Sequence, residues 1–328
     1  MKQLLTLLSL LIWLPLAAQQ GFSFLNLPAN ARVAALGGYA VSMADGDLSM
    51  GYHNPALLSD STIGQVYFLF NPFMANINRY NAVTQFKLSK FGPMSAGVLF
   101  MDYGMFEETD VVGNVVGTFK AQDYVIYLGK SHTVGPFSLG LNIKMAGSYI
   151  SSTGATALLF DLGGLYRSPD QSFSVGMVIK NAGFLVTDFS PGQSTPLPFD
   201  IELGTTIKPQ YMPVRFTFTS SNLMRSQDEL FANDPYQTVT MANEIFRYLN
   251  LGSAFVLGEN VELILGYNHR RNQELRLDQG AFGAGLSYGF MIKIKDYELR
   301  YTNMKIHASG GANFFSIKTN ATAIKNIF

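Results

Sequence analysis

The chain has 328 residues, no cysteine, equal numbers of basic and acidic residues, and a hydrophobic content of 48%. With only 14% charged residues it is too apolar to be disordered, so a sizeable folded body is expected. The lack of a basic surplus argues against nucleic-acid binding, and the lack of cysteine excludes disulfides, thiolate metal sites and thiol nucleophiles.

The N-terminus has the pattern of a secretory signal peptide. Met1 to Gln3 carry one positive charge, and the apolar run LLTLLSLLIWLPLAA and two polar residues, Gln19 and Gln20, follow. This run is shorter than the roughly 20 residues that a transmembrane helix needs, which disfavours a signal anchor. We therefore expect residues 1–20 to be removed during secretion.

The remaining chain predicts a transmembrane β-barrel. It contains no apolar run of roughly 18 residues that could form a spanning helix. Its mean hydropathy is nevertheless positive, at +0.14. A secreted apolar chain without a spanning helix fits a closed barrel, in which apolar side chains face lipid and polar or small ones face the lumen. The stretch FSLGLNIKMAG shows this alternation, with Phe137, Leu139 and Leu141 on one face and Ser138 and Asn142 on the other.

We expect about fourteen antiparallel strands, an even number as in bacterial barrels. They lie near residues 63–71, 77–89, 93–101, 117–131, 136–150, 154–167, 171–182, 199–208, 213–220, 245–257, 260–269, 280–289, 292–302 and 309–318. Even-numbered connections are short, among them SKFGP, HTVGP and a turn near GFM. Most odd-numbered ones are long, such as DYGMFEETDVVGNVV, although the one around Ser151 to Gly154 is short.

This alternation of connection lengths predicts an orientation, because outer-membrane barrels have short periplasmic turns and longer surface loops. We expect long loops on the cell surface and a periplasmic N-terminus. A soluble secreted β-sandwich or propeller is the alternative. The low charge and the aromatic residues near strand ends, including Tyr80, Phe91 and Tyr166, favour the barrel.

Residues 21–60 precede the barrel, which we assign to residues 61–328. The segment is apolar and rich in glycine, and we expect it to fold into the lumen as a plug or hatch. Its motif is Asn54-Pro55-Ala56. Pro55 fixes φ and pushes Asn54 away from helical geometry, which gives a rigid kink.

Two further groups of residues are candidate sites. Asp296, Glu298 and Arg300 are expected to face the lumen, either pairing with one another and with the plug or lining a solute path.

The connection from Ser221 to Glu244 is long enough to be functional. It carries the apolar residues Leu223, Phe231 and Tyr236, so it either docks a partner protein or covers the barrel mouth.

Catalytic constellations are not recognisable. The four histidines lack metal-ligand spacing, and Asp45 to Asp47 suit an Asx-type turn better than a Ca²⁺ site. The stretch GAGLSYG lacks the lysine and the strand-loop-helix setting of a phosphate loop, so its glycines suit a curved sheet. We expect a protein that is not an enzyme and that uses neither cofactor nor metal.

Three stretches carry a resemblance to a known family. ARVAALGG, DGDLSMGYHNPALL and YGFMIKIKDYELRYTN look like the PorV/PorQ family of outer-membrane proteins of Bacteroidota, PorQ more than PorV. That family is related to FadL-type transporters, which share a fourteen-stranded barrel and an N-terminal hatch with an Asn-Pro-Ala motif. The matching residues here are Asn54, Pro55 and Ala56.

The resemblance implies a function in the type IX secretion system. It implies a barrel that scaffolds a surface attachment complex for secreted cargo, with PorU, PorV and PorZ, outer-membrane lipid and anionic lipopolysaccharide as partners. The alternative function is that of a FadL-like transporter of long-chain fatty acids or other hydrophobic compounds, whose hatch moves and whose wall has a lateral gap. Fold alone does not decide between them.

Overall fold

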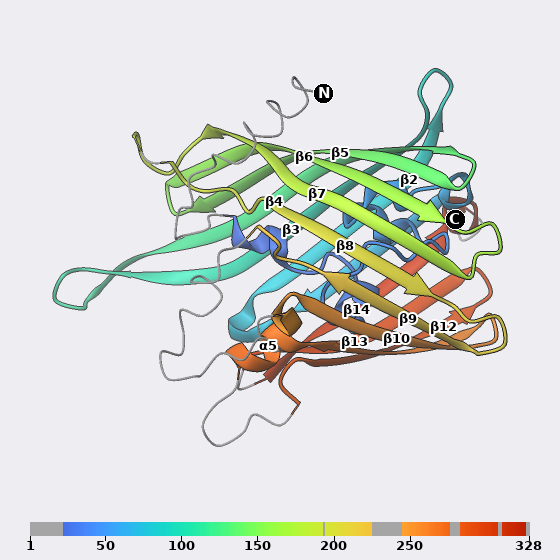
Figure 1. The fold of residues 1–328 in the computed structure, drawn as a ribbon. Coiled ribbons are helices and arrows are strands. Elements are labelled where there is room, and N and C mark those ends of the chain that lie inside the picture. Colours follow the sequence, from blue (N-terminus) through green and yellow to red (C-terminus); the bar gives the residue numbers. More distant parts are fainter. Residues whose placement is uncertain (1–21, 193, 225–244, 276–282, 308–309, 326–328) are drawn as a thin grey trace, which may run out of the picture.

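A computed structural model describes residues 22–192, 194–224, 245–275, 283–307 and 310–325, so the predicted signal peptide lies outside the described residues. In this part of the chain fourteen antiparallel strands close into a barrel in sequence order, with β14 paired to β1 (Figure 1). The predicted fold class is confirmed. The strands are β1 (Gln65–Pro72), β2 (Asn78–Leu88), β3 (Gly92–Thr109), β4 (Val115–Val134), β5 (Phe137–Ile150), β6 (Thr153–Arg167), β7 (Phe173–Thr187), β8 (Asp200–Ile207), β9 (Val214–Ser220), β10 (Leu249–Leu257), β11 (Val261–Asn268), β12 (Leu286–Ile294), β13 (Tyr297–His307) and β14 (Gly310–Asn320).

Alternation along the strands separates an apolar outer face from a lumenal face. In β5, Leu139 and Ile143 are exposed on the outside, whereas Asn142 and Lys144 are fully buried in the lumen. Exposed apolar side chains on every second residue would be costly in water, and they suit a wall that faces lipid. Among the described helices, none has the length and apolarity to cross a membrane.

Aromatic side chains form a row on the outer face. Register pairs join Phe290 to Tyr301, Tyr301 to Phe315, Phe315 to Phe70, Phe70 to Tyr80 and Tyr80 to Phe100. Ring centroids lie 5.2–6.5 Å apart in the pairs Phe290–Tyr301, Tyr301–Phe315, Phe70–Tyr80 and Tyr80–Phe100. A second aromatic group, Phe137, Tyr166 and Phe173, lies at the opposite end of its strands. Aromatic girdles of this kind mark the two membrane interfaces of outer-membrane barrels.

The connections define two ends of the barrel. The short-turn end carries connections 89–91, 135–136, 168–172, 208–213, 258–260 and 295–296. The long-loop end carries 73–77, 110–114 and 151–152 and the described parts of longer connections, 188–192, 194–199, 221–224, 245–248, 269–275 and 283–285. The long-loop end also holds the 3-10 helix η5 (Met74–Asn76) and helix α5 (His269–Glu274), and helix α6 (Ala321–Lys325) follows β14.

Three local predictions about these connections are wrong. Most of the expected loop DYGMFEETDVVGNVV belongs to β3 and β4, which continue as a hairpin with a short turn at 110–114. The turn expected near GFM lies instead at 295–296, where Lys295 has a left-handed φ of 54°. Consequently β12 and β13 begin about five residues later than predicted.

Residues 22–64 lie inside the barrel, where they form short helical turns (blue in Figure 1). These are η1 (Ser23–Asn26), α2 (Ala31–Ala35), η2 (Leu48–Tyr52), η3 (Pro55–Leu57) and η4 (Asp60–Thr62). Irregular backbone in a lumen needs hydrogen-bond partners, and inward strand side chains provide them. Seven strand side chains donate hydrogen bonds of 2.6–2.9 Å to backbone carbonyls of the segment: Asn81 to Ala29, Thr302 to Ala31, Ser287 to Ala35, Asn250 to Leu36, Ser174 to Ser42, Asn142 to Gly51 and Ser131 to Leu58.

The segment crosses the lumen from one end to the other. The carbonyls of Leu27 and Pro28 accept from Arg79, which lies near the start of β2 at the long-loop end. Residues 59–62 lead directly into β1 at the short-turn end. The start of β1 thus lies at the short-turn end, and the periplasmic position expected for the N-terminus stays a prediction. The described chain itself begins in the opposite half of the lumen.

Candidate functional site

The Asn54-Pro55-Ala56 motif forms a capped turn against the wall. The Asn54 side chain accepts from the amide of Ala56 at 3.0 Å and so caps η3, whose first residue is Pro55. Its amide nitrogen donates to Val41 O at 2.7 Å and to Gly164 O in β6 at 3.3 Å. Asn54 is completely buried. The motif therefore ties two parts of the N-terminal segment to the barrel wall.

Two paired glycines make room for this turn. Gly140 in β5 and Gly163 in β6 are register partners. A Cβ at Gly140 would meet the backbone of Pro55 and Ala56, and one at Gly163 would meet the Asn54 side chain. Any larger residue at either position would push the motif off the wall, so the glycines define a slot for it.

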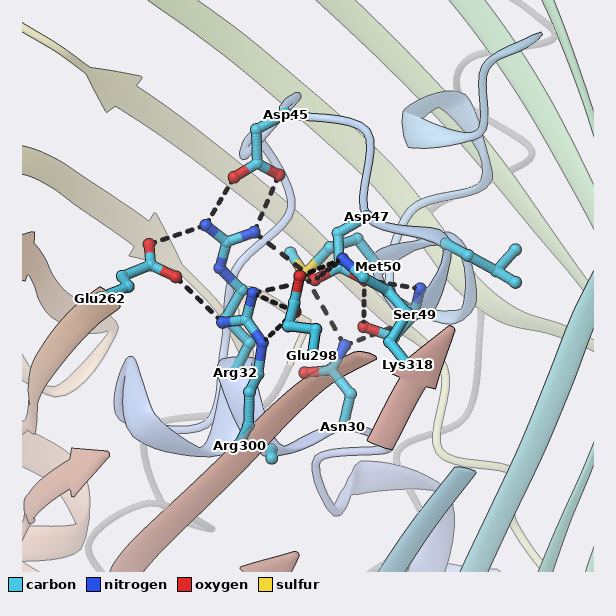
Figure 2. A network of polar contacts seen from close by, with 12 residues as sticks. Asn30, Arg32, Asp45, Asp47, Ser49, Met50, Glu262, Glu298, Arg300 and Lys318 are labelled. Atoms are coloured by element: carbon cyan, nitrogen blue, oxygen red, sulfur yellow. Dashed lines mark hydrogen bonds and ion pairs between the residues drawn. The ribbon is translucent and has the colours of Figure 1, made fainter. Parts of the chain in front are cut away.

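A network of ion pairs holds the segment at a second place (Figure 2). Four cations and four carboxylates take part: Arg32, Arg215, Arg300 and Lys318 with Asp45, Asp47, Glu262 and Glu298. Arg32, Asp45 and Asp47 come from the N-terminal segment, and the others come from β9, β11, β13 and β14. The network thus joins the segment to four strands.

Arg32 and Arg300 are its central members. The guanidinium of Arg32 lies 2.5 Å from Asp45 and 2.8 Å from Glu262, and that of Arg300 lies 3.0 Å from Glu262 and 2.7 Å from Glu298. Glu262 therefore bridges the two arginines. Buried charges are tolerated only when paired in this way, because a lone charge would carry a large desolvation cost.

The network keeps the two aspartates of the segment ionised. Burial opposes ionisation, but attraction by Arg32 and Arg215 outweighs it and holds the pKa of Asp45 well below its usual value. For Asp47, the nearby Lys318, Arg300 and Arg32 lower the pKa to about 2 in spite of burial. Asp47 also accepts from the amide of Ser49 at 3.1 Å, which is the Asx-type turn that the sequence favoured over a Ca²⁺ site.

A second polar group lies on the wall formed by β5 to β8. Lys144 pairs with Asp161 at 2.5 Å, and both side chains are fully buried. Lys180 pairs with Glu202 at 3.0 Å. The Lys144 ammonium also lies 4.3 Å from the ring centroid of Tyr52.

His53 follows Tyr52 and is buried beside these lysines. Its Nε2 accepts from the amide of Ala29 at 3.1 Å. Burial first, then repulsion by Lys180, Lys144 and Arg79, lowers the pKa of His53 well below its ordinary value. The imidazole is therefore neutral and serves as an acceptor within the segment. Within the described ranges, no group of three His, Asp or Glu residues is arranged to hold a metal ion.

The half of the lumen nearer the long-loop end holds a large apolar cluster, and we call it the apolar half, although the polar side chains of Asn71, Arg79 and Asn81 are also buried there. Phe22, Phe24 and Leu25 of the N-terminal segment pack there in one hydrophobic cluster with inward strand residues. The strand members that are 0% exposed are Leu69, Leu99, Val125, Ala146, Ala155, Ala157, Leu159, Met304 and Phe314. Partly buried Phe73, Ile77, Tyr103, Leu185, Phe189, Leu197 and Ile306 extend the cluster toward the loops.

At the short-turn end a mixed cavity of about 540 Å³ opens beside the segment. Met43, Leu57 and Leu165 give it apolar walls, and Arg167 and Lys208 give it a basic rim. The ion pairs and the asparagine turn lie between this cavity and the apolar half of the lumen, so the segment separates the two ends.

The structure brings together some of the residues singled out in the sequence. Glu298 and Arg300 lie in the ion network, whereas Asp296 lies outside it in the exposed turn between β12 and β13. Leu223 is 37% exposed just after β9. The two aromatic residues singled out in this loop, Phe231 and Tyr236, lie outside the described residues.

Sequence reasoning missed Arg32, Asp45 and Glu262 as a joined group. One signal was available, because Arg32 stands alone in the otherwise apolar stretch ARVAALGG. A lone arginine in a segment that is expected to be buried needs a carboxylate partner. Nothing local could have pointed to Glu262, which lies 230 residues away.

Comparison with solved structures gives the class of protein. The chain is similar to a "TodX monoaromatic hydrocarbon channel deltaS2 mutant", with a TM-score of 0.51 and 13% identity over 88% of this chain and 96% of the other. A Pseudomonas aeruginosa FadL homologue gives a TM-score of 0.49 and 10% identity over 89% of this chain and 98% of the other. A KdgM porin gives a TM-score of 0.35 and 7% identity over 78% and 98%.

These similarities, at such low identity, are similarities of fold. The chain has the fold of a fourteen-stranded β-barrel like that of TodX, and its N-terminal segment lies inside the barrel. No protein-family model and no curated protein matches the sequence. The resemblance to the PorV/PorQ family therefore stays a prediction.

Proposed function

We propose that this protein passes small hydrophobic compounds through the outer membrane and that its N-terminal segment closes the lumen to water and ions. The apolar half of the lumen carries this proposal. General porins have polar, water-filled lumens. Here the inward faces of β1, β3, β4, β6 and β14 contribute Leu69, Leu99, Val125, Leu159 and Phe314 instead. The N-terminal segment packs against these side chains and leaves them 0% exposed, so a solute would reach them only where the segment moves aside, and such a lining favours apolar solutes over sugars or ions.

The fold and the wall support the same function. TodX, which has a similar fold, is described as a monoaromatic hydrocarbon channel. In the described part of this chain, β7 pairs with both neighbours as far as Lys180, but its residues 181–187 pair only with β6. Leu185, Phe189 and Leu197 line the lumen beside this break, which would give an apolar solute a lateral route into the membrane.

Orientation is part of the proposal. We assign the long-loop end to the cell surface and the short-turn end to the periplasm, as the connection lengths suggest. A solute would then meet the apolar half of the lumen first, and the ion pairs and the asparagine turn would hold the barrier behind it.

Uptake of a labelled hydrocarbon tests the proposal. A Gram-negative host without its own hydrophobic-compound channel would express the wild type, Leu99→Trp or Val98→Trp, and uptake of radiolabelled toluene and dodecanoic acid would be measured. Leu99 faces the lumen and is 0% exposed, whereas its neighbour Val98 is 46% exposed on the lipid face. We expect uptake with the wild type and Val98→Trp, and loss of uptake when Leu99→Trp fills the lumen. Uptake no faster than in the empty host, with the barrel folded, would refute the proposal.

A second candidate is a surface scaffold of the type IX system. One observation favours it, because the N-terminal segment contacts strands around the whole barrel and a scaffold can work with a closed lumen. Its partners would be PorU, PorV and PorZ or lipopolysaccharide. Purification from native outer membrane in mild detergent distinguishes the two functions, since the scaffold predicts stoichiometric surface proteins and the channel predicts a lone barrel.

A further inference from the structure

The hairpin of β3 and β4 extends beyond the barrel wall. The last register pair that joins β3 to β2 is Asp102 with Asn78, and β4 meets β5 only from Ala121 onward. Residues 103–119 between these points form a free two-stranded ribbon, which projects past the other strands on the left of Figure 1. In the described structure neither outer edge of this ribbon pairs with another strand. Unpaired edges are unusual in stable proteins unless something covers them.

The base and the tip of the ribbon are both well defined. At the base, the register shifts between Asp102 and Met105, and Asp102 accepts from the amide of Gly104 at 2.9 Å, which marks a bulge. At the tip, one Asp110 oxygen accepts from the amides of Val112 and Asn114, each at 2.9 Å. The other accepts from the Asn114 side chain at 3.0 Å. These hydrogen bonds lower the pKa of Asp110 and hold the turn in one conformation.

This rigid tip presents apolar side chains to the outside. Val111 and Val112 are 105% and 81% exposed, and Val115 and Val116 are 58% and 62% exposed. Isolated exposed valines need no explanation, but four on one short turn form a patch that typically marks an interaction site. Holding the patch rigid before binding reduces the entropy that a partner would have to overcome.

Lipid does not suit this patch. The ribbon begins beyond Phe100, which belongs to the aromatic row on the outer face. It carries Glu107, Glu108 and Asp110, and residues 103–119 contain no basic side chain. Three carboxylates would be repelled by anionic lipopolysaccharide and by the same ribbon of a second copy.

We propose that residues 103–119 are a docking element for a partner protein that offers an apolar pocket bordered by basic side chains. The valines of the tip would enter the pocket, and Glu107, Glu108 and Asp110 would pair with its rim. The open edges of the ribbon would allow the partner to add a strand. This interaction surface is independent of passage through the lumen.

Cysteine labelling tests this proposal, because the chain has no cysteine of its own. Val112→Cys would be compared with Ser152→Cys, an exposed control in the β5–β6 connection at the same end of the barrel. Open outer-membrane fragments from the native organism, accessible from both sides, would react with a maleimide before and after a high-salt wash. The purified folded protein gives the reference rate.

We expect Val112→Cys to react roughly tenfold more slowly in unwashed fragments than in the purified protein, which requires about nine-tenths occupancy. The high-salt wash should restore its rate by screening the charges. Glu107→Lys with Glu108→Lys should also restore it, and Ser152→Cys should react alike in all preparations.

Three results would overturn the proposal. Equal rates for Val112→Cys in fragments and in the purified protein would mean that nothing covers the tip. Protection that survives the salt wash would indicate lipid or saccharide as the cover. Protection that survives both charge reversals would exclude a basic partner. Heat-modifiable migration on gels would show in each case that the barrel is folded.

Discussion

Gly163 and Gly164 are neighbours in β6 that face opposite sides of the wall. A Cβ at Gly163 would collide with Asn54, whereas one at Gly164 would meet only a Leu139 carbon at 4.0 Å. We expect Gly163→Ala to lower the free energy of unfolding by about 1–3 kcal/mol, as overpacking does. Gly164→Ala should change it by less than about 0.5 kcal/mol. Urea unfolding of the barrel in detergent measures both, and equal losses would show that the slot does not hold the motif.

Glu262 is the residue on which the ion network depends most. It neutralises Arg32 and Arg300 at 2.8 and 3.0 Å, so Glu262→Gln leaves buried positive charge uncompensated. We expect Glu262→Gln to lower the free energy of unfolding by about 3–5 kcal/mol. Glu274→Gln is the control, because Glu274 is 38% exposed and its pair with Arg270 is worth only about 0.5 kcal/mol. If both variants unfold at the same urea concentration, the network does not stabilise the structure.

At the scale of elements, the N-terminal segment should respond to acid through His53. The pKa of His53 in the folded protein lies below its unfolded value of about 6.5. Below pH 6.5 the unfolded state therefore binds a proton at His53 that the folded state does not bind. The contribution of His53 to the free energy of unfolding is therefore fully present above pH 6.5. It is lost as the pH drops below 6.5, by up to about 1.4 kcal/mol per pH unit. Asp45 and Asp47, with lowered pKa values, contribute stability above about pH 4 and lose it only below.

Between pH 6.5 and 5 the protonation of His53 should contribute to this fall in stability, together with that of His269, whose pKa burial also lowers. His53→Gln retains an acceptor for the Ala29 amide and cannot titrate. Its free energy of unfolding should decline less steeply across this window than that of the wild type, because His269 still titrates in both proteins. A parallel decline in the variant would assign the effect to other groups.

The strands were predictable wherever alternation has a physical cause. Between the membrane interfaces one face meets lipid and the other the lumen, so apolar and polar residues alternate, as in β5. Beyond the membrane both faces of a hairpin meet water and the pattern disappears. For that reason DYGMFEETDVVGNVV was interpreted as a loop although it forms the ends of β3 and β4.

The prediction of where the β12–β13 turn lies was wrong for a different reason. The turn was expected near GFM, but Gly289 lies inside β12, where a Cβ would meet Thr302 and Ala35. Of the glycines that were assigned to a curved sheet, Gly283 and Gly285 lie instead before β12 with φ values of 77° and 75°. Gly289 provides room for the N-terminal segment and makes no turn.

The ion network could not be predicted from the sequence either, because Arg32 and Glu262 meet only once the barrel has closed. Contacts between a plug and its wall are long-range, and local pattern contains little information about them.

For the molecule as a whole, the arrangement combines a lipid-facing barrel, an apolar half-lumen, and a segment fixed by a glycine slot and eight charged groups. Within this ion network the charges cancel four against four. A lumen filled by such a segment differs from the water-filled channel of a porin, as the proposed function requires.

The most direct test of this closure is the ion conductance of the purified, folded full-length barrel in a planar lipid bilayer. We predict no steady conducting steps at neutral pH, because residues 22–64 fill the lumen. Stable steps of the size seen for open porins would contradict the account, since they would show that water and ions cross the barrel past the N-terminal segment.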